Sequence, residues 1–225
     1  MFRPGCKVEA TDGTRLYPRS IVRAAAHFDH VNNRVTKHPA VQVLVNDARN
    51  HLLVTRDRYD VITADIIQPI HAGAGNLYSR EYFSLVHRAL ADDGLALQWV
   101  GHREATQYRL IVRTFMDVFP HTTAWINGSL LVGSLAPLRI DTAAFARKLD
   151  NPRIREGLAD VNLASVDALL AAYTAGPDEL RAFVGEGPLL TDDHPRIEFF
   201  GSLPSGEKAI DVRGLHGDVS RHVKR

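Results

Sequence analysis

The sequence contains one cysteine, Cys6, which excludes an internal disulfide framework and a zinc site built from several cysteines. It has no excess of either charge: 27 Lys and Arg face 26 Asp and Glu, for a formal net charge of +1. We therefore expect no nucleic acid among its partners. No apolar run approaches the roughly 20 residues that span a bilayer, and residues 1–7 lack the apolar core of a signal peptide. The chain as given is expected to be cytoplasmic.

What is present favours a folded domain. Hydrophobic residues make up 45% of the 225 residues and charged residues 24%, which is typical of a globular protein with a real core. The length fits one α/β domain or a domain with a small appendage. The histidines are scattered without the spacing of metal ligands, so we expect no metal.

Strands and helices are predicted to alternate along the first half of the chain. Apolar and β-branched runs predict strands at residues 41–45, 59–65 and 95–100. Helices are predicted around them: one begins at Pro18, one is capped by Ser79 and ends at Asp93-Gly94, and one closes at Pro120. This alternation predicts an α/β fold with a mostly parallel, Rossmann-like sheet.

The second half predicts a hairpin and then helices. Asn127-Gly128 separates two strand-like runs, 122–126 and 129–134, and predicts an antiparallel terminal hairpin. Helices are predicted at 142–149, 165–173 and 178–184. We expect a core at residues 1–136, a helical cap of the same domain at 137–204, and a flexible tail at 205–225.

Two acids stand where strands are predicted to end. Asp47 follows the run 41–45, and Asp65 closes the run 59–65. Ligands of such sheets bind beyond the carboxyl ends of the strands, where one acid can hydrogen-bond a nucleoside and the other can accept a proton. The alternative is structural: Asp47 caps the helix at 48–53, and Asp65 starts a turn. For Asp192-Asp193, the rim of the site and a turn before Pro195 are equally good interpretations.

The order and spacing of several segments resemble the polyamine aminopropyltransferases, meaning spermidine synthase and its bacterial relatives. The segments that carry the resemblance are NDAR (46–49), YDVITAD (59–65), NLYSREYF (76–83), DGLALQWV (93–100), RTF with VFPH (113–121) and TDDHP (191–195). The resemblance runs from about Pro18 to Pro204. It implies the Rossmann-like sheet of the S-adenosylmethionine methyltransferase type.

The resemblance also implies an activity, namely transfer of an aminopropyl group from decarboxylated S-adenosylmethionine to a polyamine or other amine. It implies no permanently bound cofactor, a homodimer, and the option of a longer, membrane-associated natural form. Asp65 is the implied general base. The implied contacts are Asp47, Ala48 and Ala72 with the co-substrate, and Asp65, Gln68 and Tyr78 with the amine, although aromatic packing explains Tyr78 nearly as well.

The sequence departs from the family's pattern at three places. The glycine-rich turn after the first strand is absent, and with it that central strand, for which Cys6–Ala10 is a short substitute. The acid that holds the ribose hydroxyls falls on Arg15, with Glu9 or Asp12 as replacements. Gln68 stands where the family has a second carboxylate, which weakens the case for a diamine substrate.

Our hypothesis for the missing strand is that Met1 begins inside a longer ancestral sequence. Two other functions stay open. One is an S-adenosylmethionine-dependent methyltransferase, which shares the sheet but usually lacks the Asp65–Pro69 element. The other is a non-catalytic relative that keeps the fold for binding or assembly, which the departures favour.

Overall fold

The computed structural model describes residues 7–10, 18–31, 34–64, 73–101, 104–198 and 208–224. The strands are β1 (Lys7–Ala10), β2 (Gln42–Val45), β3 (Tyr59–Ala64), β4 (Leu90–Trp99), β5 (Thr123–Trp125), β6 (Leu130–Ser134) and β7 (Tyr173–Ala175). The α-helices are α1 (Pro18–Ala25), α2 (Ala48–Val54), α3 (Arg80–Ala89), α4 (Ala105–Val118), α5 (Thr142–Leu149), α6 (Pro152–Ala159), α7 (Val166–Ala171) and α8 (Pro177–Val184).

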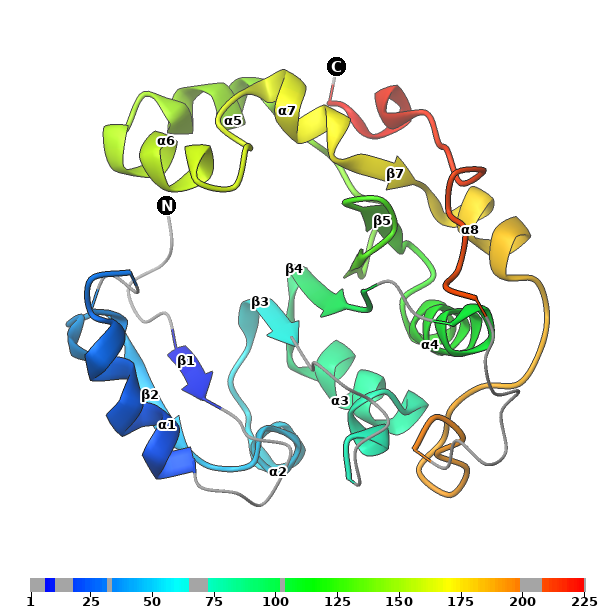
Figure 1. Cartoon of the computed structure of the whole chain (residues 1–225), viewed down its shortest axis with the longest axis horizontal. Coiled ribbons are helices and arrows are strands. Elements are labelled where there is room, and N and C mark those ends of the chain that lie inside the picture. Colours follow the sequence, from blue (N-terminus) through cyan, green and yellow to red (C-terminus); the bar gives the residue numbers. More distant parts are fainter. Residues whose placement is uncertain are drawn as a thin grey trace.

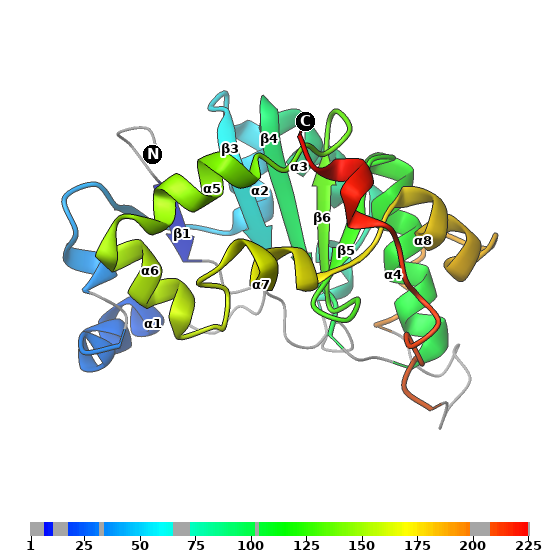
Figure 2. The ribbon, with the colours of Figure 1, turned by 90° about the horizontal axis from the view of Figure 1, so that it is seen from above.

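The described strands form a five-stranded sheet in the order β3-β4-β6-β5-β7 and a separate parallel pair, β1-β2. Helices α3 and α4 lie on one side of the larger sheet and α5, α6 and α7 on the other (Figures 1 and 2). The α/β class is therefore confirmed. The sheet is mixed rather than mostly parallel, because β3 and β4 are its only parallel pair of neighbours among the described strands. One cause is β7, an edge strand that starts at Tyr173, where the sequence predicts the end of a helix.

The predicted hairpin is confirmed in detail. β5 and β6 pair antiparallel, and the Ser129 amide donates to the Ile126 carbonyl oxygen (3.1 Å) to close the turn. The two central residues, Asn127 and Gly128, both have positive φ (52° and 77°), which is the turn that suits twisted hairpins. The buried Tyr108 hydroxyl donates to the Gly128 carbonyl oxygen (3.0 Å). Burial raises the pKa of Tyr108 to about 12, so this donor keeps its proton at neutral pH.

The predicted helix end at Asp93-Gly94 is wrong. α3 ends at Ala89, and β4 begins at once, with Leu90 opposite Tyr59 and Leu95 opposite Val61. The extra residues on β4 form an irregularity in the ladder, as in a β-bulge. A Cβ atom at Gly94 would lie 2.8 Å from the Tyr59 carbonyl oxygen, so glycine permits a close approach of two backbones here.

Aromatic rings from α3 and α4 fill the main core. The rings of Phe83 and Phe115 meet edge to face at 5.0 Å between centroids, and Phe115 contacts Phe119 at 4.8 Å. All three side chains are buried. Gly133 on β6 faces this cluster, because a Cβ atom there would lie 2.7 Å from Cγ of Phe119. β6 therefore packs directly against the rings of Phe115 and Phe119 at this glycine.

This contact predicts a stability effect. Gly133→Ala forces a methyl group into the aromatic cluster and is expected to lower the free energy of unfolding by about 1–3 kcal/mol. The matched control is Gly157→Ala on α6, where nothing lies within 4 Å of the added Cβ. That change is expected to raise the free energy of unfolding by about 0.5–1 kcal/mol, because alanine favours helix. Denaturant titration of both variants measures the difference, and equal stabilities would contradict the packing described.

The C-terminal segment does not behave as the predicted flexible tail. Ile210 and Leu215 are buried in the main core. Near its end, the Ile140 amide donates to the His222 carbonyl oxygen (2.7 Å), and the Lys224 amide donates back to Ile140 (2.9 Å). Scattered apolar anchors without periodicity explain why the sequence pattern misses this packing. The division at residue 136 stays a prediction, and β7 from the second part joins the sheet of the first.

The segment that the sequence offers as a substitute for the missing strand does form a strand, β1. It pairs in parallel with β2, from Lys7 opposite Gln42 to Ala10 opposite Val45. Among the described strands, neither β1 nor β2 pairs with β3. β1, α1 and β2 thus form a β–α–β unit. Among the described strands β1 does not join the larger sheet, so the expectation that it fills the central place is wrong. In the described ranges, no helix has the length and apolar character needed to cross a membrane.

Candidate functional site

Asp47 lies between β2 and α2 and caps the helix. Its Oδ1 accepts a hydrogen bond from the Asn50 amide (2.7 Å), and its carbonyl oxygen accepts from the His51 amide (2.9 Å). Ala48 is the first residue of α2 and is half-buried. The structural interpretation of Asp47 as a helix cap is therefore observed, and its contact with a nucleoside stays a prediction. Both uses are compatible, because a cap at a helix N-terminus holds the carboxylate in a fixed place.

Tyr78 belongs to the main core. Its side chain has no exposed surface, and its amide donates to the Gly75 carbonyl oxygen (3.0 Å), which closes the 3-10 turn Gly75–Leu77. This placement agrees with the packing interpretation of Tyr78. Contact with a substrate stays a prediction.

The remaining predicted site residues, Asp65, Gln68 and Ala72, lie outside the described residues. The strand that leads to them is described: β3 ends at Ala64, which pairs in parallel with Gln98 of β4. Asp65 therefore follows the carboxyl end of a parallel strand, as the sequence predicts.

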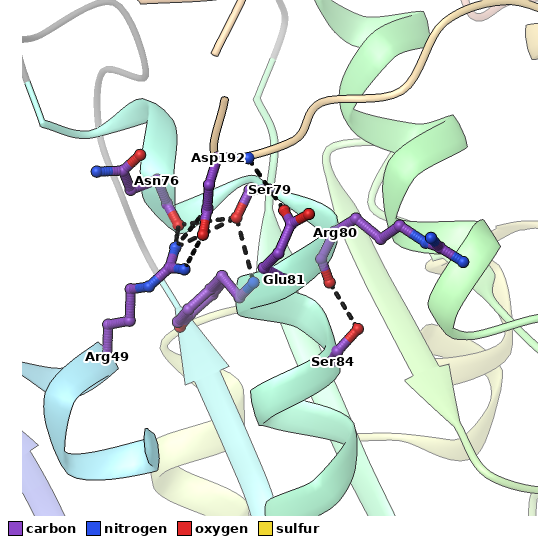
Figure 3. A network of polar contacts seen from close by, with 8 residues as sticks. Arg49, Asn76, Ser79, Arg80, Glu81, Ser84 and Asp192 are labelled. Atoms are coloured by element: carbon purple, nitrogen blue, oxygen red, sulfur yellow. Dashed lines mark hydrogen bonds and ion pairs between the residues drawn. The ribbon is translucent and has the colours of Figure 1, made fainter. Parts of the chain in front are cut away.

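A polar network that sequence reasoning missed is centred on Arg49, in the first turn of α2 (Figure 3). Arg49 Nη1 donates to the Asn76 carbonyl oxygen (2.5 Å), to Ser79 Oγ (3.2 Å) and to Asp192 Oδ1 (2.9 Å). Arg49 Nη2 donates to Asp192 Oδ2, so the guanidinium binds the carboxylate in a bidentate manner. A bidentate pair fixes the orientation of the two groups in addition to matching their charges.

The same network reaches the start of α3. The Asp192 amide donates to Glu81 Oε2 (3.0 Å), and the Arg80 amide donates to the Leu190 carbonyl oxygen (2.9 Å). Ser79 is buried and caps α3 by accepting from the Tyr82 amide (3.2 Å). The chain around Asp192 therefore bridges the first turns of α2 and α3.

A second acid from the C-terminal part holds the loop before Gly75. Glu198 Oε1 accepts a hydrogen bond from the Gly73 amide (2.8 Å). A Cβ atom at Gly75 would lie 2.8 Å from Glu198 Oε2, so glycine makes room for this carboxylate. Glu198 thus contacts the chain just before Gly75, and Asp192 contacts the first turn of α3 at Glu81.

Comparison with known proteins identifies the segment that carries Asp47 and Arg49. Residues 21–121 match the model of the spermine/spermidine synthase domain. This segment is spermidine synthase-like. Two polyamine aminopropyltransferases resemble it: that of Aeropyrum pernix is 33% identical over 91 residues, which is 39% of this chain and 29% of the relative. That of a Synechococcus strain is 32% identical over 97 residues, or 41% of this chain and 31% of the relative.

A solved structure supports the fold. A probable spermidine synthase from Corynebacterium glutamicum aligns with a TM-score of 0.55 at 18% identity, over 83% of this chain and 63% of that one. At that identity the likeness concerns the fold alone. The spermidine synthase-like chain spans less than a third of the length of the curated relatives it matches.

The matched range includes both acids predicted from the sequence and most of the network. Asp47, Arg49 and Asp65 lie within residues 21–121, whereas Asp192 and Glu198 lie beyond it. The spermidine synthase-like segment is therefore joined at this site by residues from the C-terminal part of the chain.

The network changes the titration of Asp192. Partial burial acts to raise the pKa of this carboxyl, but hydrogen bonds from Arg49 and Ser79, together with the Arg49 charge, lower it below the ordinary 3.8. A carboxyl whose pKa is lower in the folded chain stabilises the fold above its unfolded pKa. That contribution is lost as the pH falls through the lower, folded value.

We therefore expect Asp192→Asn to weaken the acid sensitivity of the fold. Between pH 5 and pH 3, the free energy of unfolding should fall less in the variant than in the wild type. Denaturant titrations at the two pH values measure this difference. Asp193→Asn is the control, since its side chain is 80% exposed and lies beside His194 (3.5 Å) rather than in the Arg49 pair, and it should keep the wild-type dependence. Identical behaviour of Asp192→Asn and wild type would contradict the ion pair.

Proposed function

We propose that the chain transfers an aminopropyl group from decarboxylated S-adenosylmethionine to an amine. The observation that carries this proposal is the domain match at residues 21–121, which contains β2 and β3 and the acids that follow them, Asp47 and Asp65. Ligands of open α/β sheets bind beyond the carboxyl ends of parallel strands. The two relatives named polyamine aminopropyltransferase give the reaction class.

The chemistry assigns a role to Asp65. An amine is protonated at neutral pH and cannot attack until it loses a proton, which Asp65 accepts as general base. The nitrogen lone pair then forms a bond to the aminopropyl carbon next to sulfur, and the carbon–sulfur bond breaks. The sulfonium takes the electron pair and leaves as neutral methylthioadenosine, and the proton passes from Asp65 to solvent.

The nucleoside side of the proposed site is the β1–α1–β2 unit with the start of α2. Asp47 and Ala48 contact the adenine in this proposal, because they follow β2 directly. The parallel pairing of β1 with β2 supports Glu9, rather than Arg15, as the acid for the ribose hydroxyls. β1 precedes α1 and lies beside β2, which is the place of the second strand in the family's sheet, and Glu9 lies on it.

The amine side is the loop between β3 and α3. Gln68 offers hydrogen bonds to an ammonium group but no opposing charge, so the proposed acceptor is held mainly by Asp65. The proposed substrate class is therefore an amine without a requirement for a second cationic end. Tyr78 is the other proposed contact of the amine, and Ala72, in the same loop, is a proposed contact of the co-substrate.

A non-catalytic relative is the second candidate, and one observation favours it. Among the described strands, β1-β2 and β3-β4 belong to separate sheets. The nucleoside side and the amine side are therefore not joined by the hydrogen bonds of a single sheet. A chain of this kind would keep a binding or assembly role without turnover.

Calorimetric titration tests the proposal before any turnover is measured. The purified chain is titrated with methylthioadenosine and with decarboxylated S-adenosylmethionine. A dissociation constant in the micromolar range, near −8 kcal/mol, supports the nucleoside site. A folded chain that binds neither compound would overturn the enzymatic proposal and favour the non-catalytic relative. Tighter binding of S-adenosylmethionine than of its decarboxylated form would instead favour a methyltransferase.

A further inference from the structure

The contacts of Arg49 join three segments that are far apart in the sequence. Asn76 and Ser79 lie 27 and 30 residues from Arg49, and Asp192 lies 143 residues away. One guanidinium therefore contacts the loop before α3, the cap of α3 and the C-terminal segment (Figure 3). The Arg49 side chain is 24% exposed and that of Asp192 39%, so the ion pair lies in a partly covered place.

The positions of these contacts matter more than their number. Arg49 lies two residues after Asp47 and next to Ala48, which are the proposed adenine contacts on α2. The Asn76 carbonyl and Ser79 flank Tyr78 on the amine side. The guanidinium thus ties the start of the helix on the nucleoside side to the start of the helix on the amine side.

The shape of the guanidinium suits this task. Its two terminal nitrogens bind both oxygens of Asp192, while Nη1 also faces the Asn76 carbonyl and the Ser79 hydroxyl. A lysine ammonium has three donors at one point and cannot reproduce this planar arrangement. Each partner is itself fixed: Ser79 by its place as a helix cap, and Asp192 through its amide and Glu81.

We propose that Arg49 is a positioning residue of the transfer site, which sets the spacing between the nucleoside side and the amine side through Asp192, Asn76 and Ser79. This role rests on the proposed function. Arg49 touches neither substrate in this proposal. It acts on the alignment of the attacking nitrogen with the carbon–sulfur bond, since small displacements of reacting groups reduce rates strongly. Asp192 is its partner in this role.

The test compares Arg49→Gln, Arg49→Lys and Asp192→Asn with the wild-type chain in steady-state aminopropyl transfer and in methylthioadenosine binding. We expect kcat to fall about a hundredfold in the Arg49 variants. The dissociation constant of methylthioadenosine should change less than about threefold, because the variants keep the proposed nucleoside contacts Asp47 and Ala48. The lysine variant should be nearly as impaired as the glutamine variant, since charge alone does not fix the orientation.

Two controls separate positioning from general stability. Arg181→Gln removes another arginine–aspartate pair on α8, Arg181 Nη1 with Asp178 Oδ1 at 2.8 Å, and should leave kcat within about twofold. The double variant Arg49→Gln with Asp192→Asn should be no worse than the poorer single variant, because both changes break the same Arg49–Asp192 contact. All assays are run below the midpoint of thermal unfolding of the least stable variant.

The outcomes are distinct. If the wild-type chain is active and all Arg49 variants keep its kcat, the positioning role is overturned and the proposed function stands. A fall in kcat that appears equally in Arg181→Gln would also overturn it. A wild-type chain that binds nucleoside but transfers nothing would overturn the proposed function, and the role of Arg49 in transfer would fall with it. Where Arg49→Gln does not fold, Arg49→Lys and Asp192→Asn carry the same comparison.

Discussion

Asp65→Asn is expected to lower kcat for aminopropyl transfer by about 10²- to 10⁴-fold, the range of a lost general base. Asparagine keeps the size and hydrogen-bonding capacity of the side chain but cannot take a proton from the attacking ammonium. The KM for the nucleoside co-substrate should change little, because Asp65 belongs to the amine side of the proposed site. Initial rates with saturating amine at neutral pH measure the effect.

The control lies on the same strand. Asp60 is exposed on β3, and Asp60→Asn should leave kcat unchanged within about twofold, as is usual for surface changes away from a site. If Asp65→Asn retains wild-type kcat, Asp65 is not the base. Raising the pH should partly restore the rate of Asp65→Asn, because more of the free amine is then neutral without help from the protein.

Glu9→Gln is expected to have a large effect on nucleoside binding. A carboxylate that accepts hydrogen bonds from ribose hydroxyls contributes about 1.5–3 kcal/mol, so its loss should weaken methylthioadenosine binding roughly 10- to 100-fold. Calorimetric titration of the variant against the wild type measures this change in dissociation constant. A kcat at saturating co-substrate that stays near the wild-type value would show that the effect concerns binding.

Calorimetric titration of Arg15→Gln with methylthioadenosine distinguishes between Arg15 and Glu9 at the position of the ribose-binding acid. If β1 is the second strand of the family's sheet, Arg15 lies in the connection to α1, and its change should leave nucleoside binding nearly unaltered. Weaker binding in Arg15→Gln together with normal binding in Glu9→Gln would contradict the place given to β1.

The elements that the sequence predicted correctly are those with local signals. Asp141 precedes α5, which has the predicted bounds Thr142–Leu149, and its side chain accepts from the Ala144 amide (2.7 Å). Ser79 caps α3 as predicted, and Asn127-Gly128 forms the hairpin turn. In each case a residue or two determine the backbone locally, without help from distant parts of the chain.

The elements that the sequence missed depend on distant partners. β7 is three residues long and is a strand only because β5 offers it an edge. Asp93-Gly94 looks like a helix stop in the sequence. In the structure Gly94 lies within β4, where the lack of a side chain lets β4 approach the backbone of Tyr59. Short strands and close approaches of this kind leave no period in the sequence.

The candidate site divides in the same way. The acids that follow β2 and β3 are found from the sequence, because strand ends and carboxylates are visible in it. Arg49 is not, since its main partner, Asp192, lies 143 residues away and no spacing rule joins them. The one available signal was the TDDHP segment, which resembles the end of the family's bacterial relatives but does not indicate which residue it contacts.

The most direct test of the proposed function is a single turnover experiment with the whole chain. The protein is incubated with decarboxylated S-adenosylmethionine and a panel of mono- and diamines, and the products are separated and identified by mass spectrometry. The account predicts methylthioadenosine and an aminopropylated amine in equal amounts, with both lost in Asp65→Asn. Nucleoside binding without either product, or a methylated product from S-adenosylmethionine, would contradict it.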